Sequence, residues 1–183
     1  IEHLEDSLFN EGSKGVKDAI LFCESLLDMV EGNSKSRVNV TVKWDGAPAI
    51  FAGINPENGK FFVGTKSVFN SKTPKINYTA ADIRKNHEGG LADKLQAALK
   101  YLPKLGIKGV LQGDMMFTDD VKKETIDGES YLTFTPNTIT YAVKSESEFA
   151  QKIKKAKLGV VWHTTYTGKT MIGMKASFGA NVN

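Results

Sequence analysis

Apolar residues near the start of the chain recur at the spacing of one helical face. These residues are Val16, Ile20, Leu21, Leu27 and Val30. Ser13 can cap the start of such a helix, and the sequence Gly32-Asn33-Ser34 ends it. The pattern therefore predicts an amphipathic helix over residues 13–31.

The remainder of the chain consists mainly of short β-type segments separated by turn residues. Strands are expected at residues 38–43, 49–52, 60–65, 108–117, 130–134, 138–144, 158–165 and 169–175. Asn55-Pro56 and Asn58-Gly59 lie between the second and third of these segments, which predicts a hairpin.

Two further helices are expected, at residues 91–102 and 146–156, and Pro103 ends the first of them. Residues 70–90 are polar and rich in turn residues, which favours a loop with a short helix. The expected fold class is therefore α+β, with antiparallel-rich β-sheets and flanking helices.

Composition is that of an ordinary globular domain, with 183 residues, 40% of them hydrophobic and 25% charged. We expect a single domain over residues 1–183, with no membrane span, because no apolar run is long enough. Cys23 is the only cysteine, which excludes an internal disulfide and is typical of a reducing compartment such as the cytoplasm (that of the host cell if the protein is viral). Cys23 lies within the predicted amphipathic helix, so we expect a buried thiol.

The net charge of +3 permits a nucleic-acid partner without requiring one. Basic residues gather in two groups along the chain. For the second group, a solvated surface is the simpler interpretation. The first group is Lys66, Lys72, Lys75, Arg84 and Lys85, and the second is Lys152, Lys154, Lys155 and Lys157. His3 and His87 have no spacing suited to a zinc site, and the sequence leaves the oligomeric state open.

The string Lys43-Trp44-Asp45-Gly46 combines an amine, a carboxylate and a flexible backbone position between two predicted strands. A lysine with a lowered pKa can act as a nucleophile, and a carboxylate can help to hold a metal-bound phosphate. As four residues alone, the string is a weak signal, and a surface lysine in a β-turn is the simpler interpretation. Its interpretation therefore depends on the motifs that follow it.

Two later strings complete an ordered set with this one. They are Gly64-Thr65-Lys66-Ser67, which ends the second strand of the hairpin, and Leu111-Gln112-Gly113-Asp114, which lies about 70 residues after the first motif. In this order the three motifs resemble those of the covalent nucleotidyltransferases, which include ATP-dependent DNA and RNA ligases and mRNA capping enzymes. The resemblance covers residues 38–165 and implies an ATP-grasp-like adenylation domain.

The resemblance implies a role for each matching residue. Lys43 would attack the α-phosphate of ATP, assisted by Mg²⁺, and would transfer AMP to a 5′-phosphate of DNA or RNA. Asp45 would hold the turn or help to place the metal, and Asp114 would contact the ribose or a metal-bound water. The other implied nucleotide contacts are Thr41, Gly46, Lys66 and an aromatic ring, which is Phe117 or alternatively Trp44.

Several positions depart from the family pattern. Thr41 replaces the usual glutamate two residues before the nucleophile, and Leu158-Gly159 lacks the later carboxylate. The closing lysine pair of the family has no good match, which favours a domain that lacks its C-terminal portion. The alternative is a non-catalytic nucleic-acid-binding or structural domain that retains a degenerate ligase-like fold. DNA or RNA as substrate and ATP or GTP as donor remain open.

Overall fold

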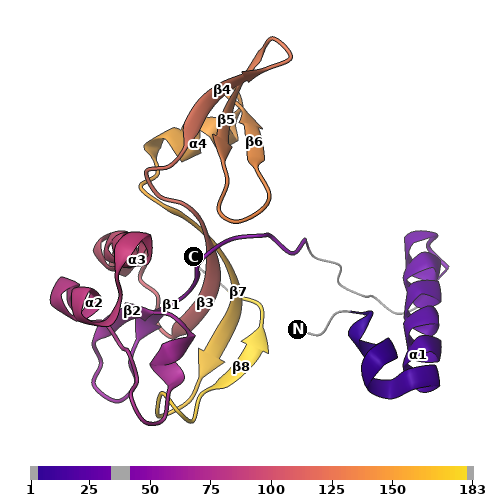
Figure 1. Cartoon of the computed structure of the whole chain (residues 1–183), viewed down its shortest axis with the longest axis horizontal. Coiled ribbons are helices and arrows are strands. Elements are labelled where there is room, and N and C mark those ends of the chain that lie inside the picture. The colour runs from indigo at the N-terminus through magenta and orange to yellow at the C-terminus, as the bar shows by residue number, and fades with distance from the viewer. Residues whose placement is uncertain (1–3, 34–41, 181–183) are drawn as a thin grey trace. The chain divides into compact units, whose positions relative to one another are not determined.

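The computed structural model describes residues 4–33 and 42–180, and the chain divides into two compact units, the first ending at Lys43 and the second beginning at Trp44 (Figure 1). Each unit is described by itself. The strand predicted over residues 38–43 lies largely outside the described residues, as does Thr41. Val42 and Lys43, its last two positions, have no regular secondary structure.

The N-terminal unit contains one long helix, α1, which spans Asp6–Val30 and bends at Gly12. Gly12 has φ 56° and ψ −131°, a conformation that glycine adopts readily. The bend brings Gly15 against the backbone oxygen of Ser7, which occupies the place where a side chain would begin. The predicted helix is therefore confirmed as the segment that follows Gly12, and a shorter helical segment precedes it.

The expectation of a buried Cys23 is wrong, because this cysteine is exposed on α1. Gly15 is the only buried residue of the helix. Helical periodicity identifies the residues that share a face, but it does not determine what covers that face.

The C-terminal unit is built on a five-stranded antiparallel sheet, which we call the main sheet, in the order β2-β1-β3-β7-β8. Its strands are β1 (Ala49–Ile54), β2 (Phe61–Gly64), β3 (Val110–Phe117), β7 (Gly159–Thr167) and β8 (Lys175–Phe178). The predicted hairpin is confirmed as β1 and β2. The last strand was predicted at residues 169–175 but begins only at Lys175, because residues 170–173 form bends and a turn.

Helices cover one face of the main sheet (Figure 1). They are α2 (Ala80–Asn86) and α3 (Gly89–Tyr101), followed by a 3-10 turn over Leu102–Leu105. Leu95 and Ala98 of α3 are fully buried in one cluster with Ile50 and Met115 of the sheet. This packing places the predicted helix over residues 91–102 on the sheet.

The opposite face of the main sheet has a separate aromatic core. Phe51 and Phe62 pack there with Val68, which belongs to the 3-10 helix η1 (Lys66–Phe69). The Phe69 ring stacks on Tyr166 with centroids 5.0 Å apart. The segment after β2 is thereby held against this face.

The C-terminal unit also contains a second, three-stranded antiparallel sheet in the order β4-β5-β6. Its elements are β4 (Lys122–Ile126), β5 (Glu129–Phe134), β6 (Tyr141–Lys144) and the helix α4 (Glu148–Lys155). Its core contains Met116 and Phe117 of β3 together with residues of β5 and α4. The sequence did not predict β4, because all five of its residues are exposed and three are charged, so no apolar alternation marks it.

The C-terminal unit is thus α+β, with antiparallel sheets and flanking helices, as the sequence predicted. Among the described residues, no helix is long and apolar enough to cross a membrane.

Asn77 is a buried polar residue that links β2 to α2. Its side-chain amide donates to the backbone oxygen of Val63 at 2.9 Å, and its side-chain oxygen accepts from Asn86 Nδ2 at 2.9 Å. An Asn77→Ala substitution leaves these partners unsatisfied, so we expect a loss of about 1–3 kcal/mol in the free energy of unfolding, measured by urea denaturation. An exposed control, Lys72→Ala, should change it by less than about 0.5 kcal/mol. Equal effects from both variants would contradict a structural role for Asn77.

His87 ends α2 and is partly buried beside Asn77. Burial, and secondarily the charge of Lys75, lower the pKa of His87 below its ordinary value of 6.5. The unfolded chain therefore binds the proton more readily than the folded protein, and the free energy of unfolding should fall as the pH drops below about 6.5.

We expect His87→Gln to reduce this pH dependence, measured by urea unfolding between about pH 7.5 and pH 5.5. Lys75→Gln should reduce it less, because the charge of Lys75 is the smaller of the two causes. An unchanged slope in His87→Gln would show that His87 does not carry the effect.

Candidate functional site

The segment that follows Lys43 runs into the main sheet beside β3. The backbone N–H of Ala47 donates to Met115 O at 3.0 Å, and that of Met115 donates to Pro48 O at 3.1 Å. These bonds extend the pairing of β1 with β3 backward toward Gly46. The first motif is therefore attached to the strand that carries the third motif.

Gly46 lies directly against Asp114. A Cβ atom at Gly46 would be 2.6 Å from Asp114 Cβ and 3.0 Å from the backbone oxygen of Met115. Such separations are too short for non-bonded atoms, so no side chain fits here. The glycine of the first motif thus permits close contact with the aspartate of the third.

The second motif lies at the same end of the main sheet. Ala49 is the cross-strand partner of Asp114, and Phe51 is the partner of Gly64, the last residue of β2. Ala49 and Phe51 are two positions apart, so both pairs share one face of the sheet. Lys66 follows Gly64 by two residues, is exposed, and begins η1, which packs on this face.

Asp114 has a neighbour that lies outside the three motifs. His163 of β7 points its Nε2 atom at Asp114 Oδ2 from 3.7 Å, and both side chains are largely buried, with 26% and 20% of their surfaces exposed. The pairing of β3 with β7 shifts between Gln112 and Gly113, whose partners are Thr164 and Trp162. His163 is thus an extra residue in a β-bulge, a local feature that sequence alternation does not reveal.

Polar groups continue along the same face beyond His163. Thr164 Oγ1 lies 2.8 Å from His163 Nδ1, and Tyr166 donates from its hydroxyl to Gln112 Oε1 at 2.8 Å. Burial raises the pKa of the Tyr166 hydroxyl above its ordinary value of 10.0.

The Asp45 carboxylate is directed to the loop between β5 and β6. It accepts hydrogen bonds from Asn137 Nδ2 at 2.9 Å and from the backbone N–H groups of Thr138 and Ile139 at 3.2 and 3.4 Å. The backbone N–H of Asp45 also donates to Tyr141 Oη at 2.8 Å. These hydrogen bonds hold the segment before β1 against the β5–β6 loop.

The two candidate aromatic residues differ in exposure. Phe117 is only 6% exposed, and its ring packs against Phe134 with centroids 5.1 Å apart. Trp44 is 39% exposed and lies beside the Tyr141 ring, with centroids 5.3 Å apart. Of the two rings, that of Trp44 is accessible to a ligand.

Lys43 is exposed and precedes Trp44 directly, as the last residue of the N-terminal unit. Within the described part of the chain, no group of three or more His, Cys, Asp and Glu side chains comes together as a metal site. Asp45 and Asp114, the two predicted metal-binding residues, direct their carboxylates to different partners.

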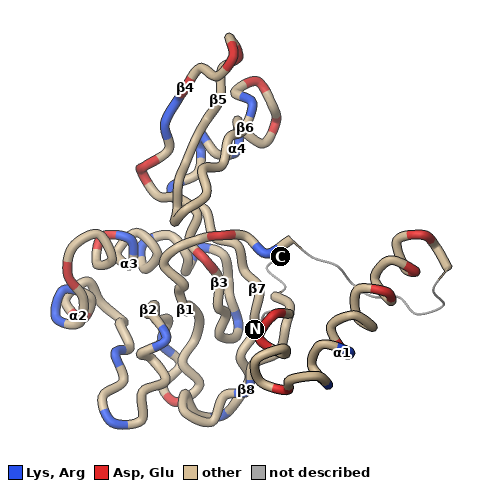
Figure 2. Tube along the Cα trace, turned by 45° about the vertical axis from the view of Figure 1, so that its right-hand side comes forward, with Lys and Arg blue, Asp and Glu red and all other residues tan. Residues whose placement is uncertain are grey.

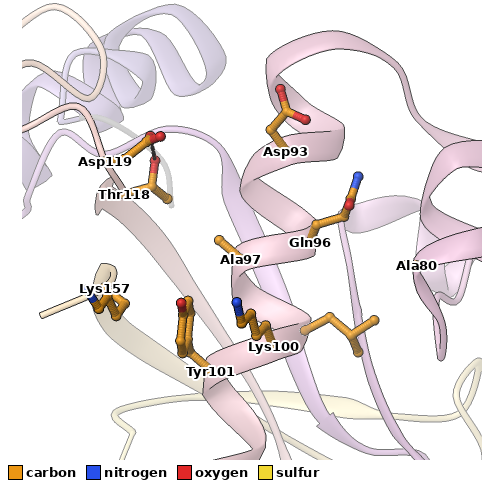
Figure 3. Close-up of a pocket in the computed structure, with 10 residues that line it drawn as sticks. Ala80, Asp93, Gln96, Ala97, Lys100, Tyr101, Thr118, Asp119 and Lys157 are labelled. Atoms are coloured by element: carbon orange, nitrogen blue, oxygen red, sulfur yellow. Dashed lines mark hydrogen bonds between the residues drawn. The ribbon is translucent and has the colours of Figure 1, made fainter.

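A surface pocket of about 530 Å³ lies elsewhere, between α3 and the end of β3 (Figure 3). Tyr101 and Lys100 of α3 line it together with Lys157, and Thr118 donates to Asp119 at 3.2 Å on its rim. None of the residues predicted from the motifs lines this pocket. The pocket is lined by two acidic and two basic side chains, so its charge does not favour an anionic or a cationic ligand. These residues are Asp93, Asp119, Lys100 and Lys157.

Comparison with known proteins places the chain in a family. Residues 1–183 match the family described as Family of unknown function (DUF6267), and the chain belongs to it. No curated protein and no solved structure matches.

The bond between Asp45 and Asn137 connects residues 92 positions apart and should contribute to stability. We expect Asp45→Ala to lower the free energy of unfolding by about 1.5–3 kcal/mol, because hydrogen bonds to a charged group are lost. Together with Asn137→Ala, it should show a coupling energy of at least about 0.5 kcal/mol in a double-mutant cycle. Asp93→Ala, at an exposed position of α3, serves as the control. Strict additivity of the first two substitutions would contradict the bond.

Proposed function

We propose that this protein is a covalent nucleotidyltransferase of the polynucleotide-ligase type, with an ATP-grasp-like adenylation domain. The observation that carries the proposal is the convergence of three motifs at one end of the main sheet. Gly46 touches Asp114, and Lys66 follows the partner strand on the same face. In the sequence these motifs are up to about 70 residues apart, so their meeting in space is independent support for a shared site.

Lys43 is the nucleophile in this proposal. It lies three residues before Gly46, and three residues of extended chain span at most about 11 Å, so covalent connectivity keeps it near the motif cluster. A neutral Lys43 amine attacks the α-phosphate of ATP, a P–N bond forms, and the bond to pyrophosphate breaks. A 5′-phosphate oxygen of the nucleic acid then attacks the same phosphorus, and the P–N bond breaks.

The surrounding residues bind and orient the nucleotide. The exposed amine of Lys66 can pair with a phosphate, and the accessible Trp44 ring can stack on the base. Bound Mg²⁺ neutralises the charge of the triphosphate and of the leaving pyrophosphate. Asp114 fits a cation ligand better than Asp45, because the Asp45 carboxylate already accepts several hydrogen bonds from the β5–β6 loop.

The second candidate function is nucleic-acid binding without catalysis. Leu158 stands just before β7, where the resembling enzymes carry a carboxylate. Basic residues are exposed on β4 and in the last turn of α4 (Figure 2). They are Lys122, Lys123, Lys152, Lys154 and Lys155. Phosphate backbones bind to such surfaces without any nucleotide chemistry.

Intact-protein mass spectrometry after incubation with ATP and Mg²⁺ tests the proposal. The wild-type chain should gain the mass of one AMP, and Lys43→Ala should gain none, because the nucleophile is missing. Lys60→Ala, at an exposed lysine outside the motifs, should retain the adduct.

A parallel incubation with GTP separates the two nucleotide donors. Absence of any adduct in the wild type, with either nucleotide, would overturn the catalytic proposal. If the same protein retarded labelled DNA or RNA in a gel, the second candidate function would be favoured instead.

A further inference from the structure

Asp114 and His163 face each other from neighbouring strands in a geometry that is not an ordinary hydrogen bond. Their Oδ2 and Nε2 atoms are 3.7 Å apart, whereas N–H···O hydrogen bonds span about 2.7–3.2 Å. The bulge in β7 aims His163 at this position on the sheet face.

The second ring nitrogen of His163 has its own partner. Nδ1 lies 2.8 Å from Thr164 Oγ1. In the neutral imidazole whose Nδ1–H donates to that hydroxyl, Nε2 presents a lone pair toward Asp114. Asp114 Oδ2 and His163 Nε2 are then two acceptors that face each other, and a cation bound between them would make this arrangement favourable. Histidine ligands of metals characteristically use the other nitrogen in such a hydrogen bond.

The separation is close to that of two ligands of one ion. With bonds of about 2.1 Å and angles between about 90° and 110°, two ligand atoms are roughly 3.0–3.4 Å apart. The observed 3.7 Å requires a shift of only a few tenths of an ångström. Two side chains suffice for an ion that also binds nucleotide, because phosphate and water complete its coordination.

The geometry points to a divalent transition-metal site formed by Asp114 and His163, with Thr164 positioning the imidazole. An imidazole ligand favours ions such as Mn²⁺ over Mg²⁺, which prefers an all-oxygen octahedral shell. This site deepens the proposed function and rests on it for the role of the ion, but binding of the ion itself does not require Lys43. The two ideas can therefore fail separately.

Titration of the metal-stripped full chain with Mn²⁺ alone, followed by electron paramagnetic resonance of the unbound ion, tests the site. We expect one bound ion in the wild type and at least about tenfold weaker binding in Asp114→Asn and His163→Asn, since removing even a positioning partner of a ligand costs about 10–100-fold. Thr164→Val should weaken Mn²⁺ binding by about 10–100-fold, because it removes the hydrogen-bond partner of His163 Nδ1. Mg²⁺ should displace the bound Mn²⁺ only at a large excess.

Matched controls are His87→Asn and Asp119→Asn, which alter the same residue types away from the site and should bind Mn²⁺ as the wild type does. Circular dichroism melting of every variant separates loss of the site from loss of the fold. Wild-type affinity in His163→Asn, or no bound Mn²⁺ in the wild type, would overturn the inference. In the latter case, protons detected on both ring nitrogens of His163 by nuclear magnetic resonance would identify the pair as a simple ion pair.

The metal titration is independent of adenylation. An Mn²⁺ site without an AMP adduct would leave the inference standing and remove the proposed function. An AMP adduct without Mn²⁺ binding at His163 would support the proposed function and overturn the inferred metal site.

Discussion

The backbone ladder of β3 is the constraint on which the rest of the C-terminal unit depends. This strand pairs with β1 along one edge and with β7 along the other. Its side chains divide among three surroundings: Met115 enters the core under α3, Phe117 enters the core shared with the second sheet, and Asp114 lies on the opposite face. One strand thus carries residues of both cores and of the candidate site, and its pairing with β1 and β7 fixes their positions relative to one another.

Close backbone approach brings the first motif to that strand. Gly46 fits against Asp114 only because it lacks a side chain, and the hydrogen bonds of Ala47 and Pro48 to Met115 hold the segment in place. Asp45 then ties the same segment to the β5–β6 loop through Asn137. A turn with these two attachments is well defined before any ligand binds, which reduces the entropy that binding must overcome.

The sequence predicted much of the fold where local signals are strong. Turn residues from Asn55 to Gly59 located the β1–β2 hairpin, and helical periodicity located α3 and α4. It missed β4, because an exposed strand rich in charge has no apolar alternation, and it placed β8 too early. Within the candidate site it identified Asp114, but it gave His163 no definite role, because only a shift in strand register turns that residue toward the carboxylate.

The β1–β2 hairpin and the helices α3 and α4 depend on interactions between near neighbours in the chain, such as turn geometry and side-chain periodicity, so the amino-acid sequence was sufficient for them. Burial and partnership depend on residues that are distant in the chain. The fold therefore determined that Phe117 is enclosed while Trp44 is accessible, and that the Asp45 carboxylate binds a loop 92 residues away. It also determined that Asp114 faces an imidazole, because a bulge in β7 depends on pairing with β3 rather than on local preference.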